Sequence, residues 1–293
     1  MRHFLKKLAT TAIAVPLALS LTTAAAYAEK IRIALAETPS DELAAFFVAL
    51  DRAKANGLDY EWTAFSDEEL AIQAVLSGQM DIGFGTPYAA MQRSKAPIRI
   101  VFQLSKLKFF PVTTKKYSSL EDLNGEPILL HSRGGGTDSI ANVIEDRLGI
   151  EFGERSYVPG SSNRVAALLG GRADATIIDL SNKNKLMKQE GDKFNVLPMF
   201  EVEASDEALF ANLDWIQNNE EAVNTFVAAL VSTWQDMSED PTIISRETNP
   251  DGPIGQLPPE ILGNLDTFYT DAVEGGLYDP NGGGEKAAMA DLE

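Results

Sequence analysis

The stretch LSGQMDI at residues 76–82 returns in altered form as LGGRADA at residues 169–175. Both stretches have the pattern of an amphipathic helix that ends at a left-handed glycine, followed by an aspartate that begins a strand. A repeat of this kind predicts two similar halves, each built from strand–helix–strand units. Coincidence between two ordinary helix-to-strand turns is the alternative interpretation.

Short β-type runs alternate with helical patterns through most of the chain after residue 28. This alternation favours an α/β fold with mainly parallel strands, with helices in the gaps. A well-marked helix start is Ser40, which stands before Asp41-Glu42-Leu43 as a cap would. The expected strands are 31–36, 59–64, 81–85, 98–103, 127–131, 155–159, 175–179 and 195–200.

Doubly wound sheets bind ligands outside the carboxyl ends of their strands. With two such sheets facing each other, the binding site becomes a cleft between two lobes that are joined by a two-segment hinge. We expect the chain to cross between the lobes around 104–114 and around 202–210. The expected division is a signal peptide at 1–28, lobe 1 at 29–113 and 202–293, and lobe 2 at 114–201.

Residues 1–28 have the pattern of an export signal. A basic start with Arg2 is followed by an uncharged apolar run at 8–21 and by the small-x-small cleavage pattern Ala26-Tyr27-Ala28. A membrane anchor is the alternative, but the run 8–21 is shorter than the ~20 residues that a bilayer span needs. We therefore expect export without stable membrane insertion.

The composition limits the cellular compartment and the binding partners that we expect for this protein. The chain has no cysteine, so it can carry neither a lipid-modified cysteine nor a disulfide. A free exported binding protein would need an outer membrane to retain it, which predicts a periplasmic protein. The formal net charge of −18 repels nucleic acid and anionic lipid, so neither is expected as a partner.

Polar turns at four predicted strand-to-helix junctions should face one cleft if the two-lobed arrangement holds. Each turn offers backbone N–H groups and hydroxyls at a helix N-terminus, where partial positive charge favours an anion or a strong acceptor. The alternative is that these residues simply cap helices. The candidate ligand-binding residues in the turns are Glu37, Thr38, Thr86, Tyr88, Arg133, Gly135, Gly136 and Thr137.

Three blocks, AIQAVLSGQMDIGFGTPYAAMQ (71–92), SLEDLNGEPILLHSRGGGTDSIANVIEDRLGI (119–150) and RVAALLGGRADATIIDL (164–180), resemble the nitrate, sulfonate, taurine and thiamine-precursor binding proteins of ABC importers. The resemblance covers most of the chain after residue 28. It implies a type II periplasmic binding fold that closes on its ligand by a hinge. It also implies that Thr86, Gly136, Thr137 and Asp179 touch the ligand. The turn Arg-Gly-Gly-Gly-Thr-Asp at 133–138 departs from the Gly-Ser-Thr turn that is more usual in the family, which leaves the ligand open.

Rings and charges suggest further contacts. Trp62 and Tyr88 could stack on a planar ligand, with core packing as the alternative. Arg133 is the best cation for a carboxylate, sulfonate or phosphate, because its fork matches two oxygens; a solvent-facing role is the alternative. Asp179 and Glu37 could accept a hydrogen bond from a hydroxyl or amine group of the ligand. If both face the cleft, a zwitterion or hydroxylated heterocycle is favoured over a pure anion.

Three functions fit an exported chain of this kind: a transport binding protein, an exported enzyme, and a ligand sensor that docks on a signalling receptor. After cleavage the only histidine is His131, and the chain has no Gly-x-Ser-x-Gly elbow and no phosphate-binding P-loop. We therefore expect no catalytic site, no metal and no cofactor. The expected function is that of a monomeric binding protein that delivers a small anion or heteroaromatic vitamin precursor to an ABC transporter permease.

Overall fold

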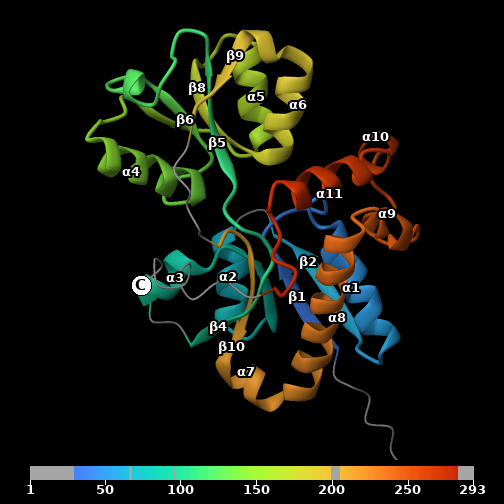
Figure 1. Cartoon of the computed structure of the whole chain (residues 1–293). Coiled ribbons are helices and arrows are strands. Elements are labelled where there is room, and N and C mark those ends of the chain that lie inside the picture. Colours follow the sequence, from blue (N-terminus) through green and yellow to red (C-terminus); the bar gives the residue numbers. More distant parts are fainter. Residues whose placement is uncertain (1–29, 66–67, 95–96, 199–204, 283–293) are drawn as a thin grey trace, which may run out of the picture.

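The computed structural model describes residues 30–65, 68–94, 97–198 and 205–282, and the predicted signal at 1–28 lies outside them. The chain forms two five-stranded sheets, each in its own half of the molecule (Figure 1). The first sheet has the order β2-β1-β3-β10-β4. Its strands are β1 (Ile31–Leu35), β2 (Tyr60–Ala64), β3 (Ile82–Gly85), β4 (Ile98–Gln103) and β10 (Ala208–Asn212).

Helices cover both faces of the first sheet, because its strands carry apolar side chains on both sides. Ile33 and Leu35 of β1 point into a core shared with the long helices, whereas Ala34 between them points into a second core with Val75. The helices of this half are α1 (Ala44–Ala55), α2 (Glu68–Leu76), α3 (Tyr88–Ser94), α7 (Leu213–Asn218), α8 (Glu220–Glu239), α9 (Ile243–Glu247), α10 (Pro259–Leu262) and α11 (Leu265–Glu274). The predicted start of the first helix at Ser40 is wrong, since residues 41–43 form a turn and α1 begins at Ala44.

The second sheet has the order β7-β6-β8-β5-β9 and is also covered on both faces. Its elements are β5 (Phe109–Thr114), η1 (Glu121–Leu123), β6 (Ile128–Leu130), α4 (Gly136–Leu148), β7 (Arg155–Tyr157), α5 (Ser161–Leu169), β8 (Ala175–Asp179), α6 (Leu180–Glu190), η2 (Gly191–Lys193) and β9 (Phe194–Val196). The predicted α/β fold of two doubly wound sheets is therefore confirmed.

One antiparallel strand in each sheet was not predicted. β5 is antiparallel to β8 and β9, and β10 is antiparallel to β3 and β4. Each of the two follows a segment in which the chain passes from one half to the other, so the regions expected to be simple crossovers also supply strands.

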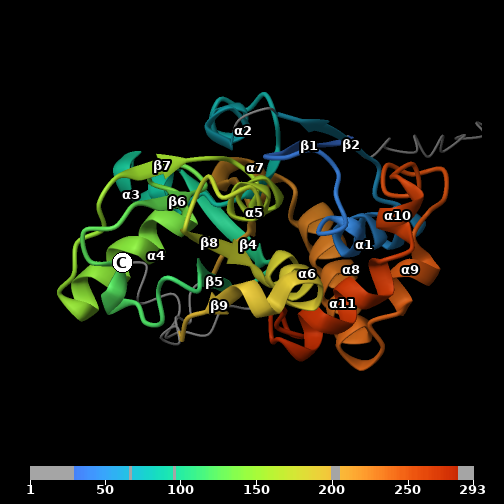
Figure 2. The same cartoon turned by 90° about the horizontal axis from the view of Figure 1, so that it is seen from above.

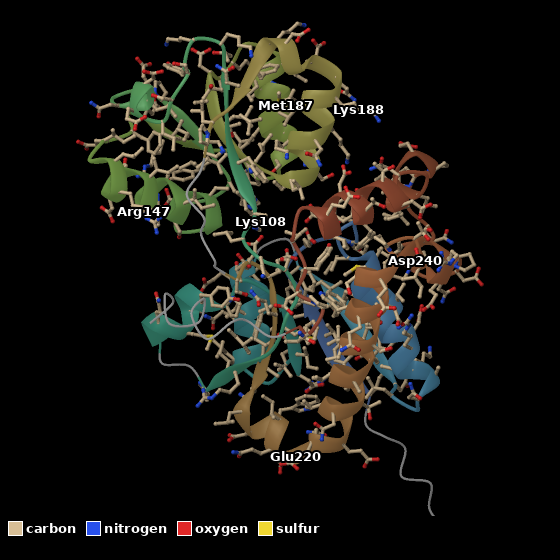
Figure 3. The ribbon with its side chains drawn as sticks, viewed as in Figure 1. Lys108, Arg147, Met187, Lys188, Glu220 and Asp240 are labelled. Atoms are coloured by element: carbon tan, nitrogen blue, oxygen red, sulfur yellow. The ribbon has the colours of Figure 1, made fainter. Side chains whose placement is uncertain are left out.

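The two crossing segments lie side by side. Leu104 N donates to Glu207 O at 2.9 Å and Asp206 N donates to Ser105 O at 3.0 Å, next to a β-bridge between Lys106 and Ser205. Lys108 lies where the first crossing segment passes between the halves (Figure 3). The structure thus has the two-segment connection expected of a hinge.

The halves also meet at a helix pair. α6 of the second half lies beside α11 of the first (Figure 2), and Asn184 Nδ2 donates to Asp271 Oδ2 at 3.0 Å between them. None of the helices in the described ranges has the length and apolarity of a membrane span. The exact lobe limits stay a prediction, and the limit at 201/202 lies outside the described residues.

The insertion of β10 beside β3 can be tested at one close contact. Gly83 is registered with Phe210, and a Cβ on Gly83 would stand 2.2 Å from the ring carbon Cζ of Phe210. We expect Gly83→Ala to lower the free energy of unfolding by about 1–3 kcal/mol through overpacking. In denaturant melts, the double variant Gly83→Ala/Phe210→Leu should cost less than the sum of the two single changes, because leucine removes the clashing atoms. If the costs of the two single changes simply add in the double variant, the close contact of Gly83 with Phe210 is contradicted.

Candidate functional site

A hollow that is open to solvent lies between the two halves at the crossing segments. Its lining comes from β3, α1, α8 and α11 of the first half, from the end of β8 and the start of α6 in the second half, and from both crossing segments. Its apolar wall consists of Phe46, Phe84, Leu104, Phe109, Leu180, Trp234, Phe268, Ala272, Leu277 and Tyr278. Its polar lining consists of Glu42, Asp179, Asp206, Glu207, Asp271, Lys108, Ser105 and Ser181. We call this hollow the interlobe pocket.

The aromatic wall is held by contacts behind it. Trp234 Nε1 donates to Leu104 O at 3.0 Å, which ties α8 to the first crossing segment. The ring of Trp234 meets Phe102 and Tyr278 edge-on, with centroids 5.3 and 5.9 Å apart. Tyr278 also stacks on Tyr269 at 6.0 Å. These fixed rings give the pocket a flat apolar surface before any ligand enters.

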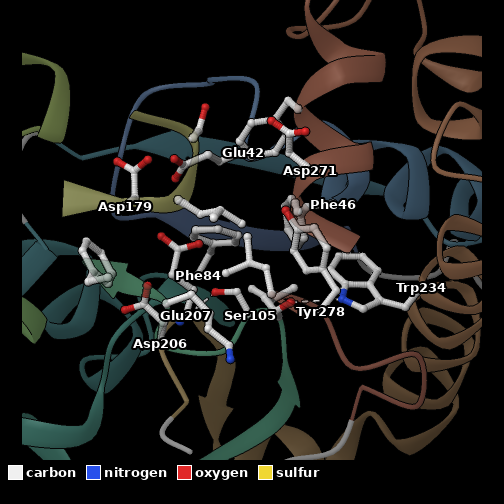
Figure 4. A pocket seen from close by; sticks show the side chains of 18 residues that line it. Glu42, Phe46, Phe84, Ser105, Asp179, Asp206, Glu207, Trp234, Asp271 and Tyr278 are labelled. Atoms are coloured by element: carbon white, nitrogen blue, oxygen red, sulfur yellow. Dashed lines mark hydrogen bonds between the residues drawn. The ribbon is translucent and has the colours of Figure 1, made fainter. Parts of the chain in front are cut away.

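Carboxylates line the pocket from two sides. In Figure 4, Glu42 and Asp179 lie on one side of the hollow and Asp206 and Glu207 on the other. One carboxylate oxygen from each of Glu37, Glu42 and Glu207 lies within 4.8 Å of the other two. Glu37 Oε1 is a buried atom that accepts no hydrogen bond from any described residue. We call Glu37, Glu42, Asp206 and Glu207 the acidic cluster.

Burial and neighbouring carboxylates perturb the protonation of the acidic cluster. Burial, and then the charges of Asp41 and Glu68, raise the pKa of Glu37 to about 7. Burial, and then Glu68, Asp179 and Glu37, raise the pKa of Asp206 to about 7.

The other two members are affected in the same direction. Burial followed by the charge of Glu37 raises the pKa of Glu207 well above its usual range. The pKa of Glu42 is also raised, first by enclosure and then by Asp179, although its side chain remains exposed to solvent in the cleft. Like charges from both halves therefore face each other across the cleft.

Two predicted residues reach this site. Asp179 lines the pocket, and its Oδ1 also accepts from Asn182 N at 2.8 Å, so it caps α6 as well. Glu37 belongs to the acidic cluster. Asp179 thus faces the pocket, whereas Glu37 lies next to it without lining it, and the expectation that a pure anion is disfavoured stays a prediction.

Thr86 and Tyr88 lie beside the acidic cluster and are not part of the pocket lining. Thr86 N donates to Glu68 Oε1 at 2.6 Å, and its hydroxyl donates to the same oxygen. The Tyr88 hydroxyl donates to Ser205 Oγ, and burial raises the pKa of Tyr88 to about 12. Both side chains are engaged by protein groups next to the site.

The glycine turn before α4 approaches the second crossing segment. A Cβ on Gly136 would stand 3.7 Å from Asp206 Oδ1, so this turn and the acidic cluster share one region. Gly135 is needed inside the turn, where a Cβ would stand 2.4 Å from Ser132 Oγ. Thr137 is buried, and its Oγ1 accepts from His131 N at 2.8 Å. Thr137 thus stabilises the turn, and its hydroxyl faces the protein.

The remaining candidates lie away from the interlobe pocket. Arg133 is exposed and stacks over the Tyr157 ring at 5.1 Å. Trp62 packs edge-on against Phe47 from β2, which is the outer strand of the first sheet. Thr38 is exposed between β1 and α1.

Sequence reasoning missed the pocket's other carboxylates and its lysine. Glu42 stands where an acidic residue is expected in a first helical turn, so its position suggested only a cap. Asp206 and Glu207 precede the strand that was not predicted, within the acidic run EVEASDE at 201–207. That run, placed directly before the apolar run ALF at 208–210, is the signal that could have revealed them.

The arrangement can hold positive charge and a flat apolar group together. Glu37, Glu42 and Glu207 could supply three oxygen ligands to a hard metal ion such as Ca²⁺. The same oxygens could accept hydrogen bonds from an ammonium or amidinium group. The aromatic wall, by contrast, offers no metal ligand and suits an organic body.

Removing one charge from the acidic cluster should stabilise the empty protein in a pH-dependent way. Because the pKa of Glu37 is raised in the folded state, its contribution to stability is present below pH ~4.5 and is lost as pH rises through about 7. We expect Glu37→Gln to raise the melting temperature by about 2–5 °C at pH 8 and to change it little at pH 4.5. Asp206→Asn should likewise raise the melting temperature at pH 8 and change it little at pH 4.5.

The exposed Glu121→Gln, outside the cluster, is the matched control for these thermal melts and should show no such pH dependence. A loss of stability at pH 8 in Glu37→Gln, or an equal effect at both pH values, would contradict the destabilising effect of an ionised Glu37 that is buried next to Asp41 and Glu68.

Comparison with known proteins agrees with the fold. The chain shares 14% identity and a TM-score of 0.65 with the alkanesulfonate-binding protein SsuA from Xanthomonas axonopodis pv. citri bound to MOPS, over 90% of this chain and 89% of that one. The chain shares 13% identity and a TM-score of 0.66 with a zinc-bound ligand-binding component of an ABC-type import system from Staphylococcus aureus, over 89% of each chain.

A Candida albicans protein with the generic periplasmic binding protein fold gives 15% identity and a TM-score of 0.62, over 83% of this chain and 80% of that one. At these identities the likenesses establish the periplasmic binding protein fold, as predicted from the sequence. No curated protein matches the chain.

A family model described as NMT1/THI5 like matches residues 42–243. The match includes α1, the whole second sheet, both crossing segments and all of α8. Since it spans more than half of the chain, this protein belongs to the NMT1/THI5-like family.

Proposed function

We propose that this chain is the solute-binding component of an ABC importer, which captures a small organic solute between its two halves and delivers it to a membrane permease. In this proposal the protein works as a periplasmic monomer and releases the solute chemically unchanged. The observation that carries the proposal is the interlobe pocket, because both halves contribute to its lining.

A solute in the interlobe pocket would touch Phe84 and Tyr278 from the first half and Asp179 and Ser181 from the second. Such a solute stabilises the arrangement in which the halves are close, and the two paired crossing segments are the element about which two lobes can open. Binding and closure are then one equilibrium, as delivery to a permease requires.

The comparisons support the same function. The structural neighbours include a sulfonate-binding protein and a component of an ABC-type import system. Within the described chain, the pocket lining contains no histidine, and His131 lies in the second half, where its Nδ1 accepts from Gly160 N at 3.4 Å. The lining supports binding by contact and charge.

Ligand-dependent stability tests this function. Protein from a periplasmic extract, unfolded and refolded to remove bound solute, is screened with sulfonates, carboxylates, pyrimidines and amines. A ligand at 100 times its Kd should stabilise the fold by about 2.7 kcal/mol, seen as a rise in melting temperature.

Ser181→Trp, which fills the pocket at the first turn of α6, should abolish that rise, whereas Gln235→Trp at an exposed position of α8 should keep it. Conversion of a compound to product, detected by mass spectrometry, would contradict the proposal. So would the absence of any shift across the panel.

A further inference from the structure

We propose that the ligand of the interlobe pocket is an organic cation, with a positively charged nitrogen group on the acidic cluster and an apolar or aromatic body on the aromatic wall. This inference rests on the proposed binding function and assigns its ligand class. It differs from the sulfonate that the structural neighbour from Xanthomonas suggests.

The first argument is the charge of the lining. Five carboxylates line the interlobe pocket, from Glu42, Asp179, Asp206, Glu207 and Asp271, against a single cation, Lys108. Glu37 adds a sixth carboxylate directly behind Glu42 and Glu207. Burial keeps part of this charge protonated in the empty pocket by raising the pKa of Glu42, Asp206 and Glu207, and a cationic guest would stabilise the ionised carboxylates, whereas an anionic guest would oppose their ionisation.

The second argument is that nearby cations are already engaged elsewhere. Arg164 is buried and donates to Ile177 O and Val158 O, and Arg155 pairs with Asp138 and Glu145. Lys183 stands over the Phe110 ring at 4.4 Å.

Two further cations have partners outside the pocket. Arg133 stacks on Tyr157, and Lys185 contacts Asp41 at 3.8 Å with its side chain 49% exposed. None of the five lines the pocket, so they leave its charge excess in place.

The third argument is energetic. Carboxylates that approach within 4.8 Å of one another, as those of Glu37, Glu42 and Glu207 do, repel each other when ionised. A bound ammonium or amidinium group would replace this repulsion by attraction and add charge-assisted hydrogen bonds. Glu37 Oε1 is buried without a donor among the described residues and Glu37 does not line the pocket, so it would act on such a group through its charge.

The aromatic wall decides between an organic cation and a metal ion. Phe46, Phe84, Trp234 and Tyr278 line the pocket beside the carboxylates and present carbon to it. Ring faces attract organic cations through their quadrupoles and bury apolar carbon. A metal ion would use the three carboxylate oxygens and leave this wall without a role.

A matched set of probes tests the ligand class by calorimetry and thermal melts of refolded protein. Benzamidine is a cation, benzamide its neutral counterpart, and benzenesulfonate an anion with the same ring. Choline and spermidine extend the cationic series, and taurine and nitrate extend the others. We expect benzamidine to bind at least tenfold more tightly than benzamide, and benzenesulfonate not to bind.

Charge-removing variants assign the binding to the acidic cluster. Glu42→Gln and Glu207→Gln keep the shape of the side chain, and each should weaken benzamidine at least tenfold. The exposed Glu121→Gln is the control and should leave the affinity unchanged. Circular dichroism confirms that each variant is folded before it is titrated.

The other outcomes each overturn the inference in a distinguishable way. Binding of benzenesulfonate or taurine with no binding of any cation would reject the ligand class and leave the solute-binding function standing. Binding of Ca²⁺, Mn²⁺ or Zn²⁺ that depends on Glu42 and Glu207, with no organic cation bound, would assign the cluster to a metal. No binding by the whole panel would reject both the ligand class and the proposed function.

Discussion

The pairing of the two crossing segments is the constraint on which the rest of the structure depends. Leu104 and Ser105 exchange backbone hydrogen bonds with Asp206 and Glu207, so the two passages between the halves act as one narrow antiparallel ribbon. Each passage runs directly into the antiparallel strand of the sheet it enters. The hinge is therefore continuous with both sheets, and residues on it are positioned by both cores at once.

This constraint explains the unusual chemistry of the pocket. Asp206 and Glu207 are held toward the cleft by backbone pairing, where they meet Glu37 from the first half and Asp179 from the second. Repulsion among these groups lowers the stability of the folded protein, and the extensive cores around both sheets offset it. Binding sites commonly sacrifice stability in this way, because a site built for a guest is strained without it.

Local sequence patterns recovered most of the parallel strands, and β4 at 98–103 and β8 at 175–179 to the residue. β5 was not predicted, because a proline such as Pro111 argues against a strand in the middle of a sheet. In the structure, Pro111 is nevertheless registered with Ile177 of β8. Glu37 and Asp179 were candidates because each follows a strand. The partners Asp206 and Glu207 were not, since their proximity arises from a crossing that joins residues about one hundred positions apart.

The carboxylates at the crossing segments also link ligand binding to the closure of the two halves. Asp179 moves with the second half, whereas Glu42 belongs to the first, and Asp206 lies between them. Without a guest, closure brings these carboxylates together and is opposed by their repulsion. A cationic guest contacts both sides and reverses the sign of that interaction, and a ligand can shift a conformational equilibrium only by such a difference in free energy. The same carboxylates would then select the guest and drive the closure that retains it.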